Sequence, residues 1–236
     1  MNLQKMIDDF LEIVFEHNGY VMILKGLKNT LLISVAGLLI GIIIGTVIAT
    51  IRVIPQYKMV TKFFCKLCEF YVALFRGTPM VVQLLVIYFV TLPLLGINQV
   101  PPELVAIAVF GLNSGAYISE IMRGGIQSVD YGQMEGGRSV GLSFGTTMMK
   151  IVIPQAVKNI LPTMGNEFIT LIKETSIVSF IGAHDLYTAF QNIGTNNYEF
   201  KIPYLTMALI YIVLVCLITL MIKIMERSLG KSDRRH

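Results

Sequence analysis

The sequence predicts an all-α membrane protein that crosses the bilayer with five helices. Of its 236 residues, 54% are hydrophobic and only 14% are charged, a balance outside the usual range of soluble globular chains. Several apolar runs approach or exceed the roughly 20 residues that a helix needs to cross the hydrocarbon core. Lys and Arg fall in short segments between these runs, so membrane topology, and not nucleic acid, explains the net charge of +4.

Residues 1–19 are predicted to form an external helix on the membrane surface. A signal peptide needs a basic start and an early apolar core, but this segment carries acidic residues at Asp8, Asp9, Glu12 and Glu16. Its apolar residues follow helical spacing at Ile7, Phe10, Leu11, Val14 and Phe15. We therefore expect no cleavage here.

The transmembrane domain is predicted over residues 20–227, with five spans separated by polar or proline-containing segments. The spans are expected at about 26–51, 80–95, 103–122, 152–180 and 203–224. The first span contains a small residue at every fourth position, namely Gly37, Gly41, Gly45 and Ala49. Such a stripe allows a second helix to approach closely, either within this chain or from a second copy.

An amphipathic helix at the lipid headgroups is predicted between the first two spans. Lys58, Lys62 and Lys66 lie along one helical face, with aromatic and aliphatic residues around it. The sequence Arg76-Gly77-Thr78-Pro79 then interrupts this helix, because proline disfavours helix at the residue before it and glycine loosens the backbone.

Orientation follows from the positions of the basic residues, which favour the cytoplasmic side of short loops. Lys and Arg follow the first, third and fifth spans, whereas 92–102 and 182–200 contain neither. The amino terminus is therefore expected outside, and the basic tail 228–236 in the cytoplasm.

A polar cytoplasmic segment, residues 123–151, connects the third and fourth spans. It is too polar to enter lipid and too short to fold alone, so we expect it to need a partner. From Glu135 the chain reads EGGRSVGLSFGTTMMKIVIP, with glycines that can end a helix or admit a close contact. A short helix held here could transmit the movement of a soluble partner to the spans, or it could be an ordinary interfacial helix.

This pattern resembles the EAA signature of ABC importer permeases, whose coupling helix docks in an ATPase. The positions that match at the right spacing are Glu135, Gly141, Ile151 and Pro154. Gly136 and Gly137 stand where the signature has alanines, an exchange that should loosen a helix by about 1 kcal/mol each. The resemblance assigns residues 123–151, and these six positions above all, to ATPase coupling.

Two further stretches resemble the polar amino-acid branch of these permeases, the histidine, glutamine and arginine type. They are Arg76-Gly77-Thr78-Pro79 followed by Gln83, and Gly165-Asn166-Glu167-Phe168 followed by Lys173-Glu174-Thr175-Ser176. The resemblance covers nearly the whole chain. It implies a type I ABC importer permease fold in a bacterial plasma membrane, a second permease subunit, identical or not, and an external binding protein that delivers an amino acid.

The same resemblance implies two ATPase subunits, which carry ATP and Mg. The chain itself has no GxxxxGK[ST] phosphate loop, so we expect it to be a transport subunit that hydrolyses no ATP and binds no cofactor. Cys65 and Cys68 form one CxxC pair, but no second pair or nearby His completes a zinc site. His184 beside Asp185 is expected to be a solvated pair in an external loop.

Ionisable residues inside a membrane span are candidates for the solute pathway, because burying their charge is costly. In the fourth span, Glu167 and Glu174 lie seven residues apart with Thr170 between them, on one helical face. These carboxylates could bind the ammonium or guanidinium of an amino acid, or pair with Lys173 and hold helices together. Further candidates for the pathway are Asn166, Gln83, Asn113 and Tyr117, and Arg76 is expected at the cytoplasmic gate or interface.

An ion-coupled secondary amino-acid transporter is the alternative. Such transporters use intramembrane acids to carry the ion, and many are built from internal repeats of spans. No repeat is evident in this sequence.

Overall fold

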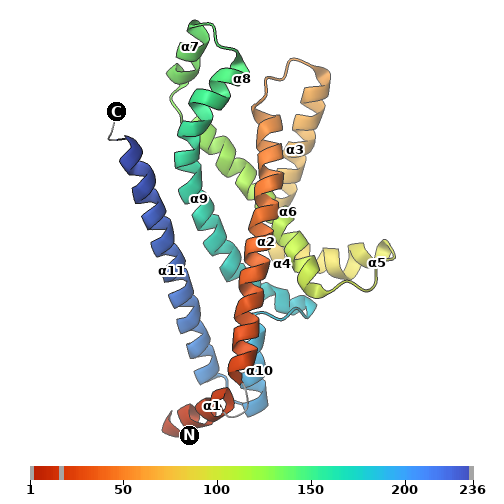
Figure 1. The fold of residues 1–236 in the computed structure, drawn as a ribbon. Coiled ribbons are helices and arrows are strands. Elements are labelled where there is room, and N and C mark those ends of the chain that lie inside the picture. The colour runs from red at the N-terminus through yellow and green to blue at the C-terminus, as the bar shows by residue number, and fades with distance from the viewer. Residues whose placement is uncertain (1–2, 16–18, 234–236) are drawn as a thin grey trace. The chain divides into compact units, whose positions relative to one another are not determined.

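The computed structural model describes residues 3–15 and 19–233, which form helices joined by short connections and include no strand (Figure 1). The expected all-α class is confirmed for these residues. The α-helices are α1 (Leu3–Phe15), α2 (Gly19–Val53), α3 (Met59–Gly77), α4 (Met80–Val86), α5 (Leu92–Leu94), α6 (Pro102–Gln127), α7 (Tyr131–Ser139), α8 (Phe144–Thr147), α9 (Ile153–Glu174), α10 (Leu186–Asn197) and α11 (Lys201–Asp233). Two π-helical segments, Ile87–Thr91 and Met148–Val152, and a 3₁₀ segment, Thr175–Ile181, complete the set.

Three of the described helices are long and apolar enough to cross a membrane, and these are α2, α6 and the Lys201–Arg227 part of α11. A fourth span results if Met59–Gly77 and Met80–Leu94, bent by 106° relative to each other, count as one. The fourth predicted span, about 152–180, corresponds to α9 and the 3₁₀ segment that follows it, which ends at Ile181. Among the described helices, α9 is not one of those long and apolar enough to cross a membrane. The count of five spans stays a prediction.

The bend between α3 and α4 follows from the predicted break. Thr78 has an extended backbone, with φ −122° and ψ 145°, the conformation that a following proline imposes. Its hydroxyl donates to the Leu74 carbonyl at 2.7 Å, which satisfies one of the carbonyls that the end of α3 leaves free. Pro79 then precedes the first residue of α4.

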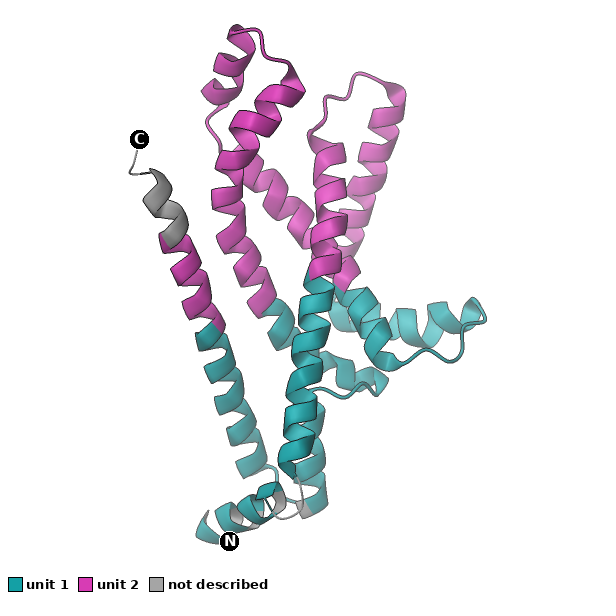
Figure 2. Ribbon diagram, viewed as in Figure 1, with its two compact units in different colours: residues 1–38, 79–110, 170–217 teal, residues 39–78, 111–169, 218–236 magenta. Residues whose placement is uncertain are grey.

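The chain divides into two compact units, coloured separately in Figure 2. Unit 1 contains residues 1–38, 79–110 and 170–217. Its largest core cluster is centred on fully buried apolar side chains, among them Ile33, Leu84, Phe110, Leu171 and Val178. In a second cluster, Phe10 and Val14 of α1 pack against Leu186, Phe190 and Ile193 of α10. The amino-terminal helix therefore rests on protein along one face, while Phe15 is exposed.

Unit 2 contains residues 39–78, 111–169 and 218–236, and its packing uses the predicted stripe of small residues. A Cβ on Gly45 of α2 would lie 2.7 Å from Ile118 Cγ2 of α6. In return, a Cβ on Gly115 would lie 2.7 Å from Ile44 Cγ2. Because these distances are too short for real carbon contacts, both positions require glycine. The stripe serves packing within the chain.

The expected solvated pair at His184 and Asp185 is wrong for Asp185, which is completely buried in unit 1. Its Oδ1 accepts hydrogen bonds from the Thr188 amide at 2.9 Å and the Thr188 hydroxyl at 2.8 Å. Asp185 therefore caps the start of α10, and its burial raises the pKa of the carboxyl.

Candidate coupling and transport sites

The segment with the EAA-like pattern forms a short helix, α7, that is closed at both ends. Asp130 caps its start, since Oδ1 accepts from the Gly132 amide at 2.6 Å. At its end Gly141 adopts a left-handed backbone with φ +86°. The Leu142 amide then bonds to the Gly137 carbonyl, and the Gly141 amide to the Arg138 carbonyl, each at 3.1 Å. These two bonds define a Schellman motif, so α7 is a defined block despite its glycines.

The next helix, α8, packs closely on α7. Ser143 caps its start by accepting from the Thr146 amide at 3.2 Å. Gly137 is buried against α8, where a Cβ would lie 2.5 Å from Thr147 Cγ2 and 3.2 Å from Ile151 Cδ1. A Cβ on Gly136 would have no neighbour within 4 Å. The two glycines therefore differ: Gly137 is required by the contact with α8, and Gly136 is not.

The predicted coupling residues split into an exposed set and a supporting set. Glu135, Gly136 and Gly141 are exposed, as is Pro154 in the first turn of α9. Gly137 and Ile151 lie at the contact between α7 and the helical segment that leads into α9. The pair α7 and α8 lies at the start of α9 (Figure 1).

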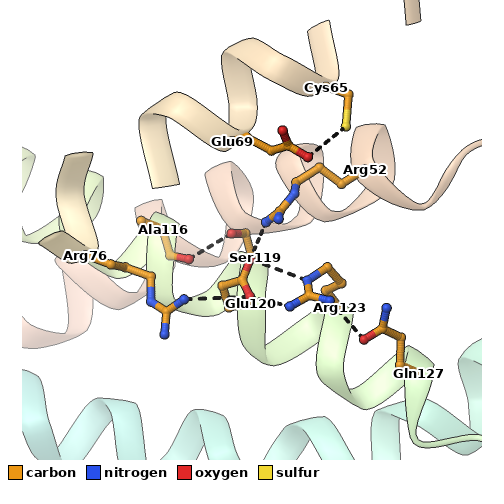
Figure 3. Close-up of polar contacts among 9 residues, drawn as sticks. All are labelled: Arg52, Cys65, Glu69, Arg76, Ala116, Ser119, Glu120, Arg123 and Gln127. Carbon is orange, nitrogen blue, oxygen red and sulfur yellow. Dashed lines mark hydrogen bonds and ion pairs between the residues drawn. The ribbon is translucent and has the colours of Figure 1, made fainter. Parts of the chain in front are cut away.

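A second feature of unit 2 is a cluster of charges around Glu120 of α6 (Figure 3). Its carboxylate pairs with Arg52 of α2, with Arg123 Nη2 at 2.6 Å and with Arg76 Nη1 at 3.7 Å. Three helices thus meet on one carboxylate. Sequence reasoning missed this role, because Arg52 lies 68 positions away from Glu120. The one available signal was a single acidic residue near the end of an apolar run.

The structure brings three of the predicted residues together at the end of α3. The Arg76 guanidinium carbon lies 5.3 Å from the centre of the Tyr117 ring, within the range of a cation–π contact. Asn113 Nδ2 donates to the Phe75 carbonyl at 3.3 Å. Arg76, Asn113 and Tyr117 therefore form one local site within unit 2.

The remaining predicted pathway residues are divided between the two units. On α9, Asn166 and Glu167 belong to unit 2, whereas Thr170 and Glu174 belong to unit 1. Asn166 is exposed and the other three are half-buried. Gln83 is buried on α4 in unit 1.

Unit 1 also contains a cavity of about 800 Å³ that sequence reasoning did not identify. It lies among the end of α9, the 3₁₀ segment, α10 and α11, and its polar lining includes Lys173, Ser176, Tyr187, Gln191 and Tyr211. Lys173 and Ser176 belong to the Lys-Glu-Thr-Ser stretch already singled out in the sequence. The other three come from segments far along the chain, and no local pattern marks them. Among the described residues no group of three His, Cys, Asp or Glu could hold a metal ion.

The family model of the binding-protein-dependent transport system inner membrane component matches residues 37–231. The arginine transport system permease protein ArtQ of Bacillus subtilis is 39% identical over 211 residues, which cover 89% of this chain and 94% of that protein. The putative glutamine transport system permease protein GlnP of Rickettsia bellii is 38% identical over 209 residues, which cover 89% of this chain and 93% of that protein.

Solved structures agree with these relatives. An amino acid ABC transporter crystallised with histidines has a chain that is 36% identical, with a TM-score of 0.83 over 93% of this chain and 98% of that chain. A chain of the MetNI methionine ABC transporter has the same fold at 17% identity. Its TM-score is 0.72 over 89% of this chain and 97% of that chain. The chain belongs to the family of binding-protein-dependent transport system inner membrane components.

Proposed function

We propose that this chain is the permease subunit of an ATP-driven importer for a polar amino acid. The capped α7 helix carries the proposal, because it gives the EAA-like segment the rigidity that a mechanical connection needs. Its Schellman motif requires glycine at Gly141, one of the positions that match the signature. The named solutes of the relatives, arginine and glutamine, support the class of solute.

Force would enter through the exposed face of α7 and leave through α9. A partner ATPase that grips Glu135 and its neighbours moves α7 and α8 as one block, because Gly137 and Thr147 are in tight contact. The long helix that follows carries Asn166, Glu167, Thr170 and Glu174. Closure of the ATPase subunits would then reposition the polar residues of α9.

The solute pathway is proposed along α9 and the cavity of unit 1. A volume of about 800 Å³ lies within the range of small-molecule sites. The cavity lining is mainly apolar, and its few hydroxyl, amide and ammonium groups could orient a polar solute. The carboxylates of Glu167 and Glu174 can attract an ammonium or guanidinium group. Gln83 is a further candidate, buried on α4.

The complex is proposed to contain two ATPase subunits with ATP and Mg, a second permease subunit and an external binding protein. The orientation has the amino terminus outside and the carboxyl terminus in the cytoplasm of a bacterium. The basis is the distribution of Lys and Arg among the connecting segments.

Reconstitution tests the proposal. The chain is placed in proteoliposomes together with its partner ATPase subunit and external binding protein, and uptake of labelled L-arginine and L-glutamine is measured with and without ATP. We expect uptake that requires all three proteins and ATP. Uptake by the chain alone, driven by a sodium or proton gradient, would instead identify the ion-coupled transporter, and failure to take up any common amino acid would refute the solute class.

A further inference from the structure

Charge is unbalanced in the cluster around Glu120. Three guanidinium groups share one carboxylate, which leaves two positive charges unmatched within the cluster. Arg52 and Arg123 make the close contacts with Glu120 and are the more enclosed, with side chains 14% and 34% exposed. Arg76 is 44% exposed, and its pairing at 3.7 Å exceeds hydrogen-bond distance. The excess charge therefore resides chiefly at Arg76.

The hydrogen-bond donors of Arg76 are largely unused among the residues that the structure describes. A guanidinium carries five N–H donors in a planar fork, and within the described part of the chain Glu120 is its one ion-pair partner. Glu69, two turns earlier on α3, lies instead beside the Cys65 thiol (Figure 3). Within the described residues, Arg76 is thus a partly exposed cation with unused hydrogen-bond donors.

The position of the Arg76 guanidinium is nevertheless fixed. Tyr117 lies beneath it at 5.3 Å, and Arg76 occupies the last turn of α3, where the helix dipole favours positive charge. Tyr117 is itself held near the end of α3, since Asn113, one turn before it on α6, donates to the Phe75 carbonyl. A preorganised guanidinium of this kind suits a planar or tetrahedral oxyanion, which it can bind with two parallel hydrogen bonds.

We propose that Arg76 on its Tyr117 platform is a binding site for an oxyanion, a carboxylate or a phosphate. The carboxylate of the transported amino acid is one source, and this version rests on the proposed function. The phosphate of an anionic phospholipid is the other, since clusters of Arg and Lys at the cytoplasmic surface attract such lipids. In both cases the ligand uses the donors that Glu120 leaves free.

The test uses the permease with its ATPase subunits in nanodiscs, without the external binding protein, so that affinity reports the membrane site alone. Binding of labelled L-arginine and L-glutamine is measured for the unaltered protein, for Arg76→Gln and for Arg76→Lys. Lys66→Gln is the matched control, because it removes one exposed positive charge from the same helix. Tyr117→Phe keeps the aromatic platform, and Tyr117→Leu removes it.

If the ligand is the solute carboxylate, Arg76→Gln should weaken binding about tenfold, the loss expected for a hydrogen bond between charged groups. The affinity of Arg76→Lys should lie between those of the unaltered protein and Arg76→Gln. Tyr117→Leu should weaken binding more than Tyr117→Phe, and binding of the amide analogue of the solute should be insensitive to all of these changes.

If the ligand is lipid phosphate, ATP hydrolysis should rise when phosphatidylglycerol is added to phosphatidylcholine discs. Arg76→Gln should abolish that rise, and Lys66→Gln should retain it.

The proposal is overturned if Arg76→Gln behaves like Lys66→Gln in both measurements. The lipid measurement does not depend on which solute is carried. If no amino acid is transported by the unaltered protein, the proposed function fails, while the lipid measurement still decides whether Arg76 binds an oxyanion.

Discussion

Replacing Gly137 by alanine should uncouple ATP hydrolysis from uptake, although the family signature has alanine at this position. The new Cβ would lie 2.5 Å from Thr147 Cγ2 and 3.0 Å from Thr147 Oγ1. Forcing an extra methyl group into a tight contact costs about 1–3 kcal/mol, and the better helix propensity of alanine returns about 1 kcal/mol. The contact between α7 and α8 should therefore be weakened by up to about 2 kcal/mol.

The neighbouring glycine provides the matched control. A Cβ on Gly136 would meet no atom within 4 Å, so Gly136→Ala should stabilise α7 by about 1 kcal/mol and leave coupling intact. Adding Thr147→Ser to Gly137→Ala should restore part of the coupling. Serine removes Cγ2, the closest atom, and keeps the hydroxyl that donates to the Ser143 carbonyl at 3.0 Å.

Uptake and ATP hydrolysis are measured in the same proteoliposomes, and the ratio of solute carried to ATP hydrolysed is compared. A loss of 1 kcal/mol in the contact lowers the ratio of docked to undocked α7 about fivefold, so the ratio of solute carried to ATP hydrolysed should fall in Gly137→Ala, by at most about that factor. The reasoning is refuted if Gly137→Ala retains the normal ratio, or if Gly136→Ala lowers it equally.

Further predictions concern both units. Gly141→Ala places a side chain at φ +86° at a cost of about 1–2 kcal/mol, so hydrolysis should continue while uptake falls; normal uptake would argue against the Schellman motif as part of the connection. Glu167→Gln should weaken uptake of a cationic or zwitterionic solute, and unchanged transport kinetics would make Glu167 structural. Reagents applied outside should label a thiol at Asn98 and spare one at Gly145, and the reverse pattern would refute the topology. Burial raises the pKa of Asp185, so the fold holds this proton more tightly than the unfolded chain. The resulting stability should be lost as pH rises through the folded-state pKa, and Asp185→Asn should remove that dependence of the melting temperature.

Features set by neighbouring residues could be predicted from the sequence. The break before Pro79 follows from the steric demand of proline on Thr78, and the glycine spacing of the first span indicated a close helix contact. The proposed coupling residues were predicted from a family pattern, although the pattern did not reveal why Gly137 differs from Gly136. That difference depends on Thr147, which only the folded chain brings against it.

Features set by residues distant in the sequence could not be predicted. Glu120 gathers arginines from two other helices, and the cavity of unit 1 has a lining drawn from four segments. Asp185 was misjudged for a related reason. Its local surroundings suggest a polar loop, but burial arises from α2, where the Thr30 hydroxyl accepts from the Leu186 amide at 3.1 Å.

The central claim is that α7 connects this permease to its ATPase. Photo-crosslinking tests it most directly, with a photoreactive residue in place of Glu135 and, as a control, in place of Asn98. We predict a covalent product between the Glu135 variant and the ATPase subunit, and none with the Asn98 variant. Absence of that product in a complex that still hydrolyses ATP and transports its solute would contradict the account.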